Sequence, residues 1–216
     1  MSELKKAIEN LKKGKKVLIF DSGEREGETD IVIPVTNVGF EDIVFMRKSG
    51  GGLICVTLPY EVAEKLDLPF MADVLQETGF NESEIPYGAD SSFSLWVNHK
   101  ETFTGITDKD RALTARKLGG IHRKVVRGKE IEFDNYFRIP GHVPILKGAE
   151  GLLNNRKGHT ELSMALAEMA GILPTMVVCE MLDDETGESL SQDKAKVFSK
   201  EKDIPFIEGK KIIKKY

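Results

Sequence analysis

The sequence predicts an α+β fold, a single domain over residues 1–216 in which helices cover a mixed β-sheet. Apolar stretches of strand length occur together with amphipathic helical patterns along the chain. No β-α-β unit repeats regularly, and several strands are separated by turns, so a purely parallel sheet is not expected. A chain of 216 residues is also long enough to bury a substantial core without disulfides.

Composition excludes several classes of protein. The net charge is −4, which argues against nucleic acid or an anionic membrane as the main partner. No apolar run approaches the length of a membrane span, and the first residues lack the apolar stretch of a secretory signal peptide. The two cysteines, Cys55 and Cys179, lie far apart in apolar stretches, without the spacing of a zinc site. We therefore expect a soluble, cytoplasmic protein with reduced thiols that binds neither nucleic acid nor membrane.

The first half of the chain shows clear periodic patterns. They predict helices at 4–11, 40–48 and 61–66, and strands at 16–20, 31–35 and 53–58. Gly14 follows the first helix where a helix would stop, and Pro34 marks an end or an edge of the second strand. Residues 68–90 have weak periodicity and several turn residues, which predicts a long loop with limited structure.

In the second half, apolar and polar residues alternate over 93–98, which predicts a half-buried strand. A helix should begin at Thr107, with Asp110 completing a capping box, and stop near Leu118 before two glycines. Residues 121–139 read as charged and irregular, and order should return at 140–146. We then expect a helix at 160–169, a strand at 175–181, a turn at 183–187, a helix at 191–198, a strand at 204–207 and a frayed basic tail.

An acidic stretch, Arg-Glu-Gly-Glu-Thr-Asp at 25–30, follows the first strand and Asp21. Glu26, Glu28 and Asp30 occupy every second position, so in an extended segment they would point to one side. Such anions repel each other unless a cation or a bound proton compensates them. The stretch is therefore either part of a metal or substrate site or a solvated acidic turn.

Two further stretches precede predicted helices. Residues 156–160 read Arg-Lys-Gly-His-Thr, and this combination of cations, glycine and helix N-terminus is typical of a phosphate pocket. His159 within it can ligate a metal. Residues 104–107, Thr-Gly-Ile-Thr, also place hydroxyls at a helix N-terminus, where an anion is favoured. The alternatives are a basic surface turn and, for Thr107, a simple helix cap.

Two single residues are candidates for acid–base chemistry. His142 follows Pro-Gly and is either a catalyst or a hydrogen-bonded core residue. Glu180 ends the apolar run 176–179, and burial there would raise its pKa toward neutrality, unless the side chain points to water. Oxygen-rich ligands without thiolates favour magnesium or manganese. The residues alone thus indicate a divalent-metal enzyme that acts on a small phosphate ester.

The same stretches resemble those of the 3,4-dihydroxy-2-butanone 4-phosphate synthase family over nearly the whole chain. The matching positions are Asp21 with residues 25–30, residues 52–55, 104–107 with 110–112, 140–143, 156–160 and 179–180. Because no GTP cyclohydrolase II half follows, the chain resembles the monofunctional members of the family. Residues 68–90 and 121–139 are similar to those of archaeal members.

The resemblance implies a three-layer version of the α+β fold. It implies conversion of D-ribulose 5-phosphate to L-3,4-dihydroxy-2-butanone 4-phosphate and formate in riboflavin biosynthesis. The expected steps of this lyase reaction are metal-assisted enolisation, dehydration, skeletal rearrangement and loss of formate. It further implies Mg²⁺ or Mn²⁺, with two ions per site when substrate is bound, and a homodimer with the active site near its interface.

The resemblance also implies residue roles. Glu26 and His159 would ligate the metal. The expected catalytic residues are His142, Glu180, Glu28 and Asp21. The expected substrate-binding residues are Arg25, Glu26, Asp30, Cys55, Thr104, Thr107, Arg156, Lys157, Gly158, His159, Thr160 and Glu180.

Two other readings of the sequence are open. One is a different metal-dependent enzyme of sugar phosphates, such as a phosphatase or an aldolase, which would release no formate. The other is a ligand-binding module, because the fold of the family is related to one that binds nucleotides and RNA. The negative net charge and the carboxylate-rich candidate site argue against the second alternative.

Overall fold

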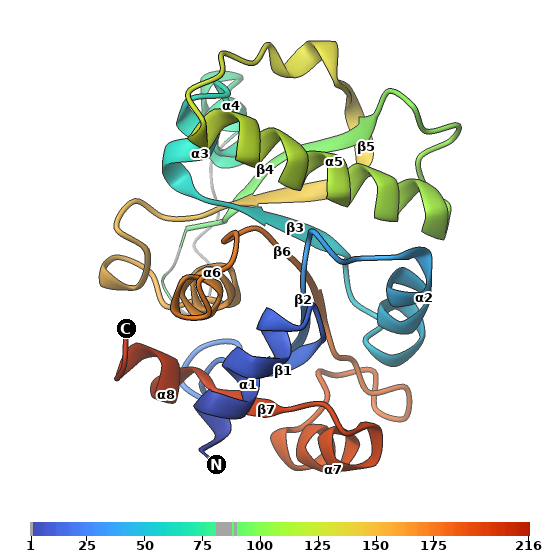
Figure 1. Ribbon diagram of the computed structural model, residues 1–216, viewed down its shortest axis with the longest axis vertical. Coiled ribbons are helices and arrows are strands. Elements are labelled where there is room, and N and C mark those ends of the chain that lie inside the picture. The colour runs from blue at the N-terminus through green and yellow to red at the C-terminus, as the bar shows by residue number, and fades with distance from the viewer. Residues whose placement is uncertain (1, 81–87, 89) are drawn as a thin grey trace.

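A seven-stranded mixed sheet forms the centre of the structure (Figure 1). The computed structural model describes residues 2–80, 88 and 90–216. The strand order is β4-β5-β3-β6-β2-β1-β7, and only β1–β7 and β3–β5 pair in parallel. The strands are β1 (Val17–Phe20), β2 (Thr29–Pro34), β3 (Cys55–Leu58), β4 (Phe93–His99), β5 (Phe137–Lys147), β6 (Met176–Glu180) and β7 (Phe206–Glu208). The predicted mixed sheet is confirmed.

Helices cover both faces of this sheet, which gives three layers. Alternate residues of β1 separate the two cores: Leu18 packs into one, whereas Val17 and Ile19 pack into the other. The first core includes residues of α2 (Phe40–Ser49), α3 (Tyr60–Glu64), α5 (Asp108–Val126) and α7 (Gln192–Lys202). The second includes residues of α1 (Glu3–Lys12), α6 (His159–Met169) and α8 (Gly209–Ile213). In Figure 1, α5 and α6 accordingly lie on opposite sides of β3 and β6.

Helix α6 positions the candidate site. Its residues from His159 to Ala167 are all buried, because the helix is enclosed by the sheet, α1 and α8. A helix buried on every side is expected to be apolar throughout. The polar residues at its N-terminus are therefore an exception that packing alone does not explain.

The predicted end of helix α5 at Gly119 and Gly120 was wrong, because the helix continues to Val126. A Cβ atom at Gly119 would overlap Cγ1 of the buried Val35, so this glycine allows the helix to approach the end of β2. The glycine pair thus marks close packing and not a helix end. None of the described helices is long and apolar enough to cross a membrane.

Three other expectations were wrong. Helix α4 (Met71–Glu77) lies within the predicted 68–90 loop, of which 81–87 and 89 are outside the described residues. The supposedly irregular 121–139 segment contains the end of α5, a short 3-10 helix (Phe133–Asn135) and the start of β5. Phe133 and Phe137 stack there with ring centroids 4.6 Å apart. The basic tail is not frayed, because α8 buries Ile212 completely.

The two adjacent glycines of α5 give a matched pair of substitutions. Gly119→Ala should lower the free energy of unfolding by about 1–3 kcal/mol, because its methyl group overpacks against Val35. Gly120→Ala meets open space and should raise the free energy of unfolding by about 0.5–1 kcal/mol, through helix propensity. Urea unfolding followed by circular dichroism measures both, and equal effects would contradict the packing role of Gly119.

Candidate active site

The candidate site lies at one end of the central strands, on the face covered by α6. Asp30 of β2 is directly opposite Glu180 of β6 in the antiparallel register. Each lies two positions from a residue that packs toward α6, Val32 for Asp30 and Val178 for Glu180, and therefore faces the same side of the sheet. Cys55 of β3 is opposite Val178 and faces the same layer. Three predicted site residues from separate strands are therefore brought together by register alone.

The β1–β2 connection is a compact loop and not an extended segment, which is the case in which the alternating carboxylates would all point to one side. The amides of Arg25 and Gly27 both donate to the carbonyl oxygen of Ser22, and Gly27 has a φ of 68°. Asp21, at the start of the loop, accepts hydrogen bonds from the backbone amides of Glu26 and Glu28, each at 3.1 Å. The buried Asp21 carboxylate thus folds the loop around itself.

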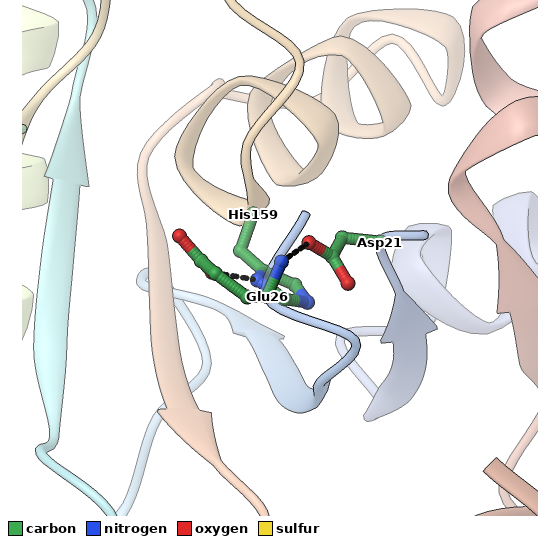
Figure 2. Close-up of side chains that lie close together, drawn as sticks. All are labelled: Asp21, Glu26 and His159. Carbon is green, nitrogen blue, oxygen red and sulfur yellow. Dashed lines mark hydrogen bonds and ion pairs between the residues drawn. The ribbon is translucent and has the colours of Figure 1, made fainter. Parts of the chain in front are cut away.

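His159, the first residue of α6, lies against this loop (Figure 2). Its Nδ1 is 3.1 Å from Oε2 of Glu26, and its Nε2 is 3.2 Å from the carbonyl oxygen of Glu28. The same Nε2 is 3.6 Å from Oδ1 of Asp30. One potential ligand atom each of Asp21, Glu26 and His159 lies within 4.8 Å of the others, which suits a shared cation. The predicted metal ligands, Glu26 and His159, are therefore adjacent.

The pKa values of this cluster reflect burial and crowding. Burial alone would lower the pKa of His159, but the carboxylates of Asp30, Glu26 and Asp21 outweigh it and raise the pKa to about 10. Burial raises the pKa of Asp30 to about 8, and nearby Glu180 adds to the effect while His159 opposes it. At neutral pH the cluster therefore retains protons that a metal cation would displace.

The Glu180 side chain is half-buried with its Oε2 inaccessible to water, so the water-facing alternative is wrong. Burial raises the pKa of Glu180, and its Oε2 has no hydrogen-bond partner among the described residues. A Cβ at Gly52 would overlap this oxygen, so the glycine provides the space for the carboxylate. Burial likewise raises the pKa of Glu28, with Glu26 adding to the shift. Burial, together with Glu180, keeps the Cys55 thiol protonated by raising its pKa well above the usual value.

Two guanidinium groups meet at the start of α6. Nη1 of Arg25 donates to the carbonyl oxygen of Lys157 at 2.9 Å. A Cβ at Gly158 would lie 2.8 Å from Nη1 of Arg156 and 3.0 Å from Nη1 of Arg25, so both groups pack against this glycine. The buried Nε of Arg156 has no hydrogen-bond partner among the described residues. Two cations beside a helix N-terminus suit a phosphate group, and the basic-surface-turn alternative fails because Gly158, His159 and Thr160 are buried.

Glu161 holds this arrangement and was missed in the sequence. It is fully buried, and its Oε2 accepts from Nη1 of Arg156 at 3.0 Å and from the amide of Gly158 at 3.3 Å. Its Oε1 accepts from the amide of Ala149 at 3.1 Å. The position of a glutamate three residues after Gly158, at the third residue of the helix, is a capping-box signal that could have revealed it.

A cavity of about 150 Å³ separates the carboxylates from the arginine. Four of its lining residues, Ser91, Ser92, Phe93 and Leu146, were not predicted as site residues. The adjacent serines just before β4 could have been noticed as hydroxyl donors at a strand entry. The predicted residues that line the cavity are Glu26, Asp30, Arg156, His159, Thr160 and Glu180.

Thr104, Thr107 and His142 form a second cluster, at β4, β5 and the start of α5. His142 is exposed, so the core-residue alternative is wrong. It precedes Leu146, a cavity-lining residue, by four positions of β5, which corresponds to about 13 Å along an extended strand. Within a single chain, the predicted catalytic residue His142 therefore does not line the cavity.

Thr107 caps α5, as the structural alternative proposed, because its Oγ1 accepts from the amide of Asp110 at 3.2 Å. The predicted capping box is not formed. The carboxylate of Asp110 instead accepts from the amide of Gly105 at 2.9 Å, which fixes the 104–107 turn. Thr104 and Thr107 both remain exposed at this turn.

Comparison with known proteins identifies the family. The family model of 3,4-dihydroxy-2-butanone 4-phosphate synthase matches residues 5–215. The synthase of Methanosarcina mazei is 49% identical over 99% of this chain and 90% of its own. That of Saccharomyces cerevisiae is 31% identical over 93% of this chain and 91% of its own.

Solved structures give the same result. A 3,4-dihydroxy-2-butanone 4-phosphate synthase in complex with two magnesium ions has a TM-score of 0.81 and 28% identity, covering 97% of this chain and 94% of that one. The Candida albicans synthase has a TM-score of 0.79 and 28% identity, covering 99% and 97%. The chain therefore belongs to the 3,4-dihydroxy-2-butanone 4-phosphate synthase family.

Proposed function

We propose that this chain converts D-ribulose 5-phosphate to L-3,4-dihydroxy-2-butanone 4-phosphate and formate, a lyase step of riboflavin biosynthesis. The observation that carries the proposal is the buried carboxylate cluster around His159, separated by a small cavity from Arg156. The cluster can hold a cation and move protons, while the arginine can hold a phosphate. Five carbons of substrate divide into four carbons of product and one of formate, and the water lost on dehydration is taken up again before formate leaves, so the overall reaction consumes and releases no water.

Glu26 and His159 would hold the divalent cation. A carboxylate oxygen and an imidazole, with Asp21 close by and no thiolate in the set, fit Mg²⁺ or Mn²⁺. We infer two ions per site with substrate bound, as two magnesium ions are present in a relative's structure. When bound, such cations stabilise negative charge on substrate oxygens as Lewis acids.

The chain's own residues would orient the substrate. Arg156 and Thr160 both line the cavity, and the buried Nε of Arg156 has no hydrogen-bond partner in the described part of the chain. The positive end of the α6 dipole adds to the attraction for a phosphate. Arg25, with Lys157 and Gly158, would close this end of the site, and Asp30 would bind the sugar hydroxyls.

Proton transfer would involve the carboxylates with raised pKa values. Removal of a proton from C1 leaves an enediolate, and the later loss of water needs a group that returns a proton. Glu180 and Glu28 suit such exchanges because burial raises the pKa of each above that of a free carboxyl group. Asp21 would act mainly by holding the amides of Glu26 and Glu28 in place.

A homodimer would complete the site. Apolar side chains are exposed around the second cluster, with Phe103 92%, Ile106 51% and Ile139 42% exposed. Clustered apolar exposure of this kind is typical of protein interfaces. We infer that a second copy covers this surface, so that His142, Thr104 and Thr107 of one subunit reach the carboxylate cluster of the other.

The metal assignment is tested by Glu26→Gln. Loss of the ligand charge should reduce magnesium-dependent formate release from ribulose 5-phosphate by about 10² to 10³-fold. The matched control is Glu24→Gln, an exposed residue of the same loop, which should keep its activity. Both variants should keep the thermal midpoint of the parent. Full activity of Glu26→Gln with magnesium would show that the ligand is wrong.

Metal binding should also release protons, because the raised pKa of His159 keeps the ring protonated in the metal-free chain. As the pH rises toward the His159 pKa of about 10, fewer protons compete with the metal, and the affinity for Mg²⁺ increases by up to about tenfold per pH unit for one proton. Calorimetry at pH 8 in buffers of different ionisation enthalpy measures the release. A binding enthalpy that does not vary with buffer would contradict it.

The shared site is tested by mixing two inactive variants, Glu26→Gln and His142→Ala. Co-expression should form heterodimers in which one of the two sites has both native residues, so about a quarter of the parental activity should return. Each variant alone supplies the background rate. Failure of the purified heterodimer to regain activity would place both residues in one subunit's site.

A further inference from the structure

Asn98 of β4 connects His142 to the 104–107 turn. Its side chain is almost completely buried, at 6% residue exposure. Oδ1 of Asn98 accepts a hydrogen bond from the backbone amide of His142 at 2.9 Å. Nδ2 lies 3.3 Å from the carbonyl oxygen of Thr104 and 3.0 Å from Nδ1 of the His142 ring. One amide thus contacts both the backbone and the imidazole of the same histidine.

The chemistry of these partners fixes the protonation pattern of the ring. A backbone amide can only donate and a backbone carbonyl can only accept, so the Asn98 oxygen must face His142 N and its nitrogen must face Thr104 O. The Asn98 nitrogen therefore donates to Nδ1 of His142, which must be unprotonated. In a neutral imidazole the single proton is then on Nε2.

The Asn98 side chain is closely packed, and its hydrogen bonds to His142 N and Thr104 O decide which way round the amide lies. Gly105 has a φ of 92°, and a Cβ at this residue would overlap the Asn98 side chain. On the other side, a Cβ at Gly141 would overlap the backbone of Val97 and Asn98. Residues 139–142 form a bulge in β5, because Val97 pairs with Val143 while Asn98 pairs with Arg138. The bulge frees the His142 amide to bond to a side chain.

We infer that Asn98 is a positioning residue that holds His142 in the tautomer with the proton on Nε2. His142 then supplies a hydrogen bond to a substrate oxygen as a neutral donor, and the removal of protons from carbon falls to the carboxylate cluster. A neutral imidazole can polarise a carbonyl group in this way without taking up a proton. The inference rests on the proposed function, which gives His142 its place at the substrate.

Nuclear magnetic resonance of the unmodified protein tests the tautomer directly. The chain has four histidines, so ¹⁵N-labelled histidine gives few ring signals, and His142→Ala identifies the relevant pair. At a pH where the ring is neutral, Nε2 should show the protonated shift and Nδ1 the unprotonated one. The opposite pattern would overturn the inference without any variant having to fold.

Two substitutions at Asn98 separate tautomer control from simple support of the turn. Asn98→Asp keeps the acceptor for His142 N but can only accept at Nδ1, so it favours the inverted tautomer. Asn98→Ala loses every one of these hydrogen bonds and leaves the tautomer free. We expect kcat to fall about 10² to 10⁴-fold in Asn98→Asp and less in Asn98→Ala, with a smaller change in KM.

If Asn98 only supported the turn, kcat would fall further in Asn98→Ala than in Asn98→Asp, because alanine removes more hydrogen bonds than aspartate. The comparison is made at a pH where the ¹⁵N shifts show a neutral ring in both variants. An Asn98→Asp enzyme as active as Asn98→Ala, or more active, would overturn the inference. Failure of the proposed function is distinguishable, because the unmodified chain would then release no formate from ribulose 5-phosphate. If only the role of His142 were wrong, His142→Ala would release formate at the parental rate.

Discussion

The crowding of carboxylates around one buried imidazole is the constraint on which the rest of the site depends. His159 can occupy its position only because α6 is enclosed by apolar contacts that fix its N-terminus beneath the sheet. Close approach to the carboxylates then requires backbone of unusual shape at Gly27 and little bulk at Gly52. The glycines in this region thus allow the charged groups to approach each other, in addition to allowing the chain to turn.

Much of the fold and of the site could be predicted from the sequence. Periodicity located the central strands, and the residue types of 25–30 and 156–160 indicated one shared site. The loop shape could not be predicted, because it depends on two backbone hydrogen bonds to Asp21 that spacing does not reveal. The path of α5 through two glycines depends on contact with Val35, distant in sequence.

His142 shows a different limit of sequence reasoning. The residue type of His142 suggested catalysis, and its neighbours suggested a rigid turn. Neither observation indicates on which side of the molecule the histidine lies. The structure places it on the β4–β5 side, among exposed apolar residues and away from the carboxylates on β2 and β6. In the proposed homodimer, residues that act together would come from two subunits, and a single sequence contains no direct record of such a division.

The antiparallel register that sets Asp30 opposite Glu180 has a consequence for how this protein can evolve. Like charges directly across a ladder are unfavourable, and both groups are also desolvated. Replacement of either by an amide or an apolar residue would relieve that repulsion. Selection for thermostability alone would therefore favour the loss of these acids, which under the proposed function are kept by selection for turnover. Stabilising libraries screened without an activity assay should accumulate changes at this pair first.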